Sequence, residues 1–255
     1  MEISLSGKVA VVTGAASGIG CAITRAYLAC NAAGVVAVDR RDPALVLQES
    51  KSRYGDRLQF VTGDVGVEKT SADFVETSTR RFGRLDILVC NAGVSVIKPV
   101  HEHTPEEWDE VFNTNVKAVY WACRHAIPVM IAQGGGLVLL TGSISGETGI
   151  PTQGAYAPSK GALHQMTRQM AVEYAKHHIR VNTIACGTVD TPIVDRSAQA
   201  SGDPDAYWNM LRSNHPIGRI ASADEVASFF AFMASDHATF FTGSVLMMDG
   251  GYTAR

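Results

Sequence analysis

The chain has 255 residues, 46% of them hydrophobic and 18% charged, and its net charge is -3. This composition allows a sizeable α/β core and excludes the strongly basic surface of a nucleic-acid-binding protein. No apolar run reaches the roughly 18 residues of a transmembrane helix, so we expect no membrane partner. The chain opens without a basic segment and apolar run, and its five cysteines form no Cys-x-x-Cys pair. Together these features predict a cytoplasmic protein with reduced thiols.

A strand, a glycine-rich turn and a helix are the first predicted elements. Residues 8–13 form a short apolar run rich in β-branched residues, Gly14–Gly20 follow, and a helical pattern runs from Ile19 to Cys30. In this order, glycines let the backbone approach a pyrophosphate at a helix N-terminus whose N–H groups attract it. The spacing Gly-x-x-x-Gly-x-Gly differs from the commoner Gly-x-Gly-x-x-Gly, and a turn needed only for packing is the alternative.

A second buried strand over residues 34–38 ends at Asp39. An acid about 20 residues beyond the glycines, at a strand end, is suited to hold the hydroxyls of an adenosine ribose. The alternative is a cap or turn acid. Arg40 and Arg41 follow, and an arginine there can instead accommodate a 2′-phosphate.

The pattern then predicts a helix over 43–53, a strand over 58–62 and a helix over 67–82 that stops at Gly83. Asp64 follows the strand, where it either accepts from an adenine amino group or caps the next helix.

A fourth strand over 85–90 ends in Asn91-Ala92-Gly93, a turn of small residues against which a ligand can lie. Thr104-Pro-Glu-Glu has the signature of a helix start, and we expect that helix to reach Ala132, kinked at Pro128. Asn115 lies in its apolar flank and is either structural or positions a water molecule.

Ser143 follows a fifth strand over 136–141, and a helix over 155–176 carries Tyr156 and Lys160 on one face. A phenol loses its proton only near pH ~10, but a fixed ammonium nearby lowers its pKa and makes it a useful acid or base. The Ser143 hydroxyl can hold a substrate oxygen beside it, although a turn or cap role is the alternative.

A sixth strand covers 179–184. Residues 186–221 are expected to be irregular and to form a substrate segment. A helix over 222–234 then precedes a last strand over 244–248. This alternation predicts a single doubly wound, Rossmann-like α/β domain over residues 1–255. It would contain a parallel sheet of about seven strands with helices on both faces. The ligand crevice is expected at the carboxyl ends of the strands.

With these residues placed, the chain resembles the short-chain dehydrogenase/reductase family over essentially its full length. The matching motifs are Thr13-Gly-Ala-Ala-Ser-Gly-Ile-Gly20, Asp64-Val65, Asn91-Ala-Gly93, Asn115, Ser143, Tyr156-x-x-x-Lys160, Asn182 and Asp249-Gly-Gly. One departure is Cys186-Gly187, where the family usually has Pro-Gly. We expect a looser turn there, and we also consider thiol chemistry at Cys186.

The resemblance implies a catalytic set with Tyr156 as the acid/base, Lys160 beside it, Ser143 on the substrate oxygen and Asn115 positioning a water. It implies a cofactor site formed by Gly14, Ser17, Gly18, Ile19, Gly20, Asp39, Arg40, Asp64, Val65, Asn91, Ala92, Gly93, Tyr156, Lys160, Gly187, Val189 and Thr191. Asp39 matches the NAD-preferring branch, and no metal is expected, because the eight histidines show no ligand spacing.

We therefore predict an NAD-dependent oxidoreductase that interconverts a secondary alcohol and a ketone, with a polyol, sugar or hydroxy acid as the small-molecule substrate. The alternatives are a 3-oxoacyl thioester reductase and, outside the enzymes, a dinucleotide-sensing binding protein. The resemblance also implies a homotetramer with contacts through residues 104–132, 155–176 and the last strand.

Overall fold

The computed structural model describes residues 2–254, and within them seven parallel strands form one sheet in the order β3-β2-β1-β4-β5-β6-β7. The strands are β1 (Val9–Thr13), β2 (Gly34–Asp39), β3 (Leu58–Thr62), β4 (Ile87–Cys90), β5 (Gly136–Ser143), β6 (Ile179–Cys186) and β7 (Val245–Met248). The expected Rossmann-like sheet is confirmed.

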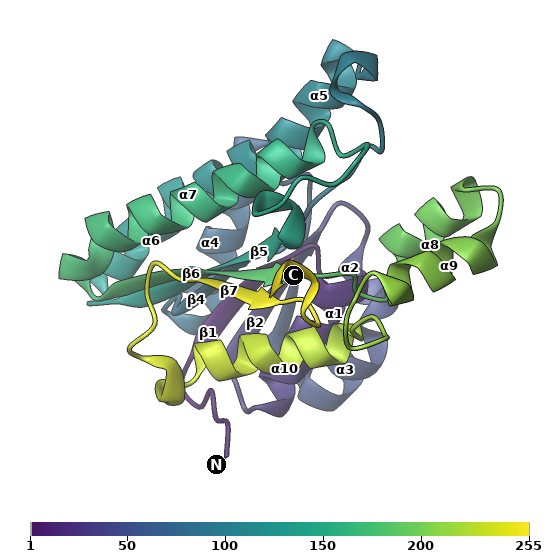
Figure 1. Ribbon diagram of the computed structural model, residues 1–255. Coiled ribbons are helices and arrows are strands. Elements are labelled where there is room, and N and C mark those ends of the chain that lie inside the picture. The colour runs from purple at the N-terminus through teal and green to yellow at the C-terminus, as the bar shows by residue number, and fades with distance from the viewer. Residues whose placement is uncertain (1, 255) are drawn as a thin grey trace.

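Helices cover both faces of the sheet (Figure 1). The helices are α1 (Gly18–Ala29), α2 (Pro43–Val46), α3 (Gln48–Tyr54), α4 (Glu68–Phe82), α5 (Pro105–Phe112), α6 (Ala118–Ala132), α7 (Tyr156–Tyr174), α8 (Pro192–Ala200), α9 (Pro204–Ser213) and α10 (Ala223–Ala234). A π-helix, Asn113–Lys117, joins α5 to α6. Helices α4, α6 and α7 lie on one face, whereas α1, α3 and α10 lie on the other. None of the helices within residues 2–254 is both long and apolar enough to cross a bilayer.

The central strands are apolar on both sides because each side meets a layer of helices. Along β1, Ala10 and Val12 enter the core shared with α1 and α10, whereas Val11 enters the core shared with α4 and α6. Side chains alternate between the faces of a strand, so a continuous run of apolar residues is what a sheet covered on both faces requires.

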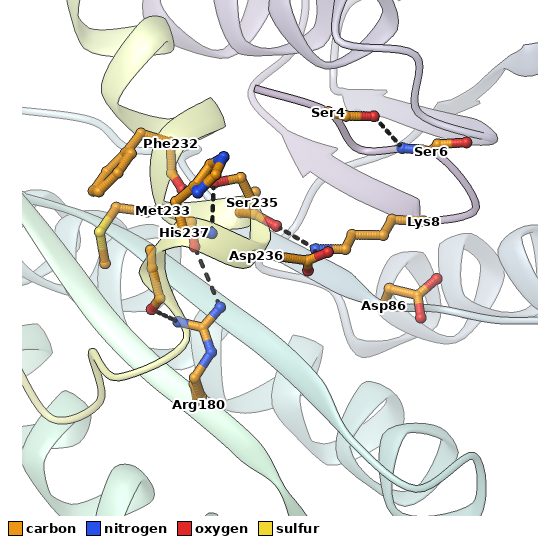
Figure 2. A network of polar contacts seen from close by, with 12 residues as sticks. Ser4, Ser6, Lys8, Asp86, Arg180, Phe232, Met233, Ser235, Asp236 and His237 are labelled. Atoms are coloured by element: carbon orange, nitrogen blue, oxygen red, sulfur yellow. Dashed lines mark hydrogen bonds and ion pairs between the residues drawn. The ribbon is translucent and has the colours of Figure 1, made fainter. Parts of the chain in front are cut away.

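The strand order reverses between β1 and β4, which lie side by side in the sheet. Chain segments leaving β1 and β4 turn to opposite faces at this point and leave a crevice at the carboxyl ends of the two strands. The opposite end is closed by polar contacts (Figure 2). There Lys8 binds Asp236, and the Arg180 guanidinium donates to the carbonyls of Met233, Ala238 and Phe241.

Three expected elements differ from the structure. The helix over 43–53 is divided at Leu47 into α2 and α3, with Asp42 capping α2. The helix over 104–132 is interrupted by the π-helix at 113–117, not at Pro128, which lies inside α6. The segment 186–221 is not irregular but contains α8 and α9, each begun by a proline in its first turn. Proline is favoured there because its missing N–H needs no partner.

Candidate active site

The glycine turn between β1 and α1 leaves no room for a side chain at Gly14 or Gly20. A Cβ on Gly20 would lie 2.2 Å from the carbonyl oxygen of Gly14, and one on Gly14 would lie 2.8 Å from Nδ2 of Asn91 and 2.9 Å from Cα of Ala92. Gly14 and Gly18 also have positive φ angles of 70° and 50°, which glycine adopts without strain. The glycines are therefore required by close backbone contacts.

The N-terminus of α1 points into the crevice and begins with Gly18, Ile19 and Gly20. Ser17 is the N-cap residue, yet its side chain makes no capping hydrogen bond, and the first turn contains no acidic residue. The hydroxyl of Ser17 instead accepts a hydrogen bond of 2.7 Å from Arg41. The N–H groups and positive potential of this helix end therefore suit an anionic ligand such as a pyrophosphate.

Asp39 is buried at the end of β2, beside the glycine turn. Its Oδ2 accepts from the backbone N–H of Ala16 at 3.0 Å, and its Oδ1 accepts from the N–H of Arg41 at 3.0 Å. The Arg41 guanidinium lies 3.7 Å from Oδ1, so Arg41, rather than its neighbour Arg40, is the arginine that reaches this site. Among the residues that the structure describes, Arg40 forms no hydrogen bond or ion pair.

Asp64 and Val65 follow β3 at the same end of the sheet. The Asp64 carboxylate accepts from the N–H of Gly66 at 2.8 Å, and the N-cap of α4 is Val67. Asp64 therefore does not cap α4, and its carboxylate is exposed, whereas Val65 is buried against the core.

Asn91 joins three strands below the crevice. Its Nδ2 donates to the Thr13 carbonyl of β1 at 2.9 Å, and its Oδ1 accepts from the Thr141 hydroxyl of β5 at 3.1 Å. The backbone N–H groups of Asn91 and Ala92 both bind Oγ1 of Thr13. These contacts fix the turn after β4 against the glycine turn.

Asn115 lies in the π-helix and is buried. Its Oδ1 accepts from the N–H of Val94 at 2.9 Å, and its Nδ2 donates to the Val94 carbonyl and to the Ser159 hydroxyl, each at 3.0 Å. A Cβ on Gly93 would lie 3.2 Å from Oδ1 of Asn115 and 3.7 Å from Nζ of Lys160. The π-helix thus brings Asn115 beside Lys160, in keeping with the frequent use of such bulges at functional sites.

Ser143, Tyr156 and Lys160 come together where β5 ends and α7 begins. The Lys160 ammonium donates to the Thr141 carbonyl at 2.7 Å and lies 5.5 Å from the centre of the Tyr156 ring. The Ser143 hydroxyl binds the Ser145 hydroxyl at 3.0 Å and accepts from the Ser145 N–H. Ser143 therefore caps the short turn after β5, and its hydroxyl also lies beside the Tyr156 phenol.

The ionisation of Tyr156 differs from the sequence-based expectation. Burial raises the pKa of the Tyr156 phenol to about 12, and its hydrogen bond with Ser143 acts in the opposite direction. Burial likewise lowers the pKa of the Lys160 ammonium to about 8. Removal from water disfavours the charged form of each group, the phenolate and the ammonium.

Cys186 is the last residue of β6 and is paired with Ser143 on one side and Met248 on the other. Cys186 therefore continues the strand, and the expected loosening of the turn in comparison with Pro-Gly stays a prediction. Burial raises the pKa of the Cys186 thiol to about 12, which leaves it neutral and argues against thiol chemistry.

Residues 187–191 cross the crevice after β6. Val189 is buried and pairs with Ala221, and Gly187 donates its N–H to the Met248 carbonyl. A Cβ on Gly18 would lie 3.1 Å from Cγ2 of Thr191. Thr191 is therefore in contact with the glycine turn, and the two segments face each other.

Sequence reasoning did not identify Thr141, Ser159 and His215, which support the site. Thr141 contacts both Lys160 and Asn91, Ser159 binds Asn115, and His215 accepts from the N–H of Thr188. Ser159 lies one residue before Lys160, and Thr141 lies two residues before Ser143. Their closeness to these motif residues in the sequence is the feature that could have identified them as part of the site. His215 has no such neighbour in the sequence.

Replacing Lys160 by Met should change how stability depends on pH. The pKa of the Lys160 ammonium in the folded protein, about 8, lies below the ordinary value of 10.5. Between pH 8 and 10.5 Lys160 therefore holds its proton in the unfolded chain but has lost it in the folded protein. The free energy of unfolding of the wild type consequently rises with pH over this range. The variant lacks this rise, so its free energy of unfolding relative to wild type should fall by about 2–3 kcal/mol between pH 7 and pH 10.

Urea unfolding of both proteins at the two pH values measures this difference, with the exposed Lys176→Met as the matched control. Parallel curves for wild type and Lys160→Met would contradict a buried ammonium.

The chain matches known proteins over nearly its whole length. A family model described as enoyl-(acyl carrier protein) reductase covers residues 14–253. Cis-4-hydroxycyclohexanecarboxylate dehydrogenase of Sinomonas cyclohexanicum is 39% identical over 97% of both chains, and the 3-oxoacyl-[acyl-carrier-protein] reductase of Thermotoga maritima is 34% identical over 97% of this chain and 98% of its own. L-sorbose reductase of Gluconobacter frateurii, solved with NADPH and L-sorbose, is 33% identical with a TM-score of 0.94 over 100% of both chains.

Proposed function

The chain belongs to the short-chain dehydrogenase/reductase family, and we propose that it is an NAD-dependent oxidoreductase that interconverts a secondary alcohol and a ketone in a polyol, sugar or hydroxy acid. The observation that carries this proposal is the meeting of Tyr156, Ser143 and Lys160 beside the glycine turn. An enzyme of this class needs an acid/base, an oxygen-binding hydroxyl and a dinucleotide site within reach of one another.

The residues present fit a nicotinamide dinucleotide. Gly18 and Gly20 carry no side chain at the N-terminus of α1, so backbone N–H groups of Gly18, Ile19 and Gly20 would hold the pyrophosphate. Asp39, Asp64 and Val65 would hold the adenosine, and Asn91–Gly93 with Gly187, Val189 and Thr191 would hold the nicotinamide half. The chemistry that a bound nicotinamide would supply there is hydride transfer to or from the substrate carbon.

The proton is handled by the chain itself. In the oxidative direction the Tyr156 phenolate takes the proton of the substrate hydroxyl, and in the reductive direction the phenol donates it to the developing alkoxide. The Ser143 hydroxyl donates a hydrogen bond to the same substrate oxygen. Because burial raises the pKa of the phenol, forming the phenolate depends on positive charge at the site, which the Lys160 ammonium supplies.

Asn115 fits a structural role together with a role in proton transfer. Its side chain fixes Val94 and Ser159 and lies beside the Lys160 ammonium. We propose that it positions a water molecule through which Lys160 exchanges protons with solvent.

A polar substrate is favoured by two buried atoms of Gln153 and His103, residues that lie in or against the segment just before α7. Within residues 2–254, Oε1 of Gln153 and Nδ1 of His103 are buried without a hydrogen-bond partner. Buried polar atoms are usually paired, so a substrate hydroxyl or carboxylate would satisfy them. Relatives that act on a hydroxycyclohexanecarboxylate and on L-sorbose support the same substrate class.

The thioester reductase remains a second candidate, because the Thermotoga maritima carrier-protein reductase is 34% identical over nearly the whole chain. A carrier-bound substrate favours a basic surface, whereas the chain has a net charge of -3. A dinucleotide sensor is disfavoured by the complete set of Ser143, Tyr156, Lys160 and Asn115.

Initial rates of NADH oxidation with a keto sugar, a cyclic keto acid and an acetoacetyl thioester separate the candidates. Faster turnover of the thioester would overturn the proposed substrate class.

We also propose a cytoplasmic homotetramer. All five cysteines are free thiols, as a reducing compartment requires. The helices expected at the interfaces expose apolar side chains, with Tyr120 on α6 46% exposed and Val172 on α7 82% exposed, and Phe240 before β7 is fully exposed. Exposed apolar side chains on these elements favour contact with further copies of the chain.

Light scattering coupled to size exclusion should therefore give four times the 27.2 kDa chain mass. Replacing Val172 by Glu should reduce that mass, whereas replacing Glu173, its exposed neighbour, by Gln should leave it unchanged. A monomeric wild type would contradict the proposed assembly.

A further inference from the structure

We propose that His215 is a positioning residue that holds the turn 187–191 in place and thereby sets the nicotinamide half of the cofactor site. The inference rests on the proposed function, because it assigns that turn to the cofactor. His215 follows α9, and its side chain is 3% exposed.

The two ring nitrogens of His215 have distinct partners. Nε2 accepts from the backbone N–H of Thr188 at 3.1 Å, and Nδ1 lies 2.8 Å from the Leu211 carbonyl oxygen. A ring nitrogen that accepts carries no proton, so Nδ1 carries the proton and donates to Leu211. His215 is therefore neutral, in one tautomer, and joins the end of α9 to the turn after β6.

The packing around His215 fixes the position of its ring. A Cβ on Gly187 would lie 2.7 Å from Nε2 of His215 and 3.0 Å from Cα of Asp249. The ring of Tyr252 lies 5.4 Å from the His215 ring, centre to centre. The imidazole therefore fills the space between Gly187 and the chain that follows β7, where only a glycine leaves room for it.

The hydrogen bond to Thr188 acts on the whole turn. The Thr188 carbonyl accepts from Ala221, Asp190 donates back to Ala221, and Thr191 contacts Gly18 of the glycine turn. Backbone groups on both sides of the Thr188 N–H are thus fixed by other hydrogen bonds. The Thr188 N–H itself donates to His215. Loss of that acceptor frees the turn at the point where it crosses the crevice, without a change at Tyr156 or in the adenosine half of the site.

Two replacements separate the two hydrogen bonds of His215. The Gln side chain reaches as far as Nε2 and places an acceptor there, so His215→Gln keeps the bond to Thr188. The shorter Asn side chain reaches as far as Nδ1, so His215→Asn keeps the donor to Leu211 and loses the acceptor. Both residues are polar and similar in chemistry, so they are a matched pair. His215→Leu repeats the loss of the acceptor with a side chain that tolerates burial.

The test is the affinity of each variant for NADH and for ADP, measured by fluorescence titration and competition, with NADPH in parallel. We expect His215→Asn and His215→Leu to weaken NADH binding by about fivefold to tenfold, the effect of one lost hydrogen bond. ADP carries the adenosine and the pyrophosphate but lacks the nicotinamide riboside, so its affinity should stay within twofold of wild type. His215→Gln should bind both ligands within about threefold of wild type. A partly unfolded variant would lose binding sites in number and not in affinity.

Equal NADH affinities for the Asn, Leu and Gln variants would overturn the role of His215, as would parallel losses for NADH and ADP. Failure of the wild type to bind ADP or either reduced cofactor would instead overturn the proposed function, so the two outcomes are distinguishable.

Discussion

Replacing Tyr156 by Phe should lower turnover by about 10²–10⁴-fold, the usual contribution of a positioned general acid or base. The change removes one oxygen and keeps the ring, which Lys160 contacts at 5.5 Å from its centre. Cofactor affinity should therefore remain close to that of the wild type. Steady-state rates and NADH titrations of the same preparations measure both quantities.

Tyr174→Phe is the matched control, because Tyr174 lies at the other end of the same helix, far from Ser143. It should keep wild-type rates. A Tyr156→Phe enzyme that retains more than about a hundredth of the wild-type rate would show that another group transfers the proton.

Replacing Asp39 by Ser should raise the ratio of NADP to NAD efficiency by at least about tenfold. A carboxylate placed against a 2′-phosphate meets a like charge, at a cost on the order of 1–4 kcal/mol near a protein surface. That cost corresponds to a preference for NAD of roughly ten to a thousand. Arg41 already lies beside Ser17, so removal of the acid leaves a cation that can pair with the phosphate. Values of kcat/KM for both cofactors with both proteins measure the effect.

The structure adds a control to this experiment. Asp39 also accepts from the N–H groups of Ala16 and Arg41, so its loss can disturb the glycine turn as well as the charge. Asp39→Asn keeps one acceptor oxygen and removes the charge, and it should shift cofactor choice in the same direction. Arg41→Ala should instead lower NADP efficiency, because it removes the cation that would pair with the 2′-phosphate. A wild type that already prefers NADP would mean that Arg41 outweighs Asp39, and the proposal of NAD would be wrong.

The parts of the fold that could be predicted are those in which the residue types at a position permit only one local backbone structure. The strand over 58–62 was placed with the boundaries that the structure shows, and Gly83 ends α4 in the left-handed conformation expected of it. The glycine turn was equally readable, because contacts of 2.2–2.8 Å leave no room for a Cβ at Gly20 or Gly14.

The parts that could not be predicted depend on contacts between distant segments. The π-helix at 113–117 contains Asn115, whose partners Val94 and Ser159 lie outside the local sequence pattern. Which of Arg40 and Arg41 reaches Asp39 and Ser17 depends on the path of the chain after β2, and the sequence does not show that path. The raised pKa of Tyr156 requires its burial, and a spacing of four residues from Lys160 carries no information on burial.

The most direct test of the central claim is the absorbance of reduced nicotinamide when the wild-type protein is mixed with NAD or NADP and a panel of polyols, sugars, hydroxy acids and cyclic secondary alcohols. We predict that at least one of these alcohols produces NADH at a rate that depends on enzyme concentration, with formation of the matching ketone. Tight binding of NADH without turnover of any alcohol or ketone would contradict the account and identify the protein as a dinucleotide-binding sensor.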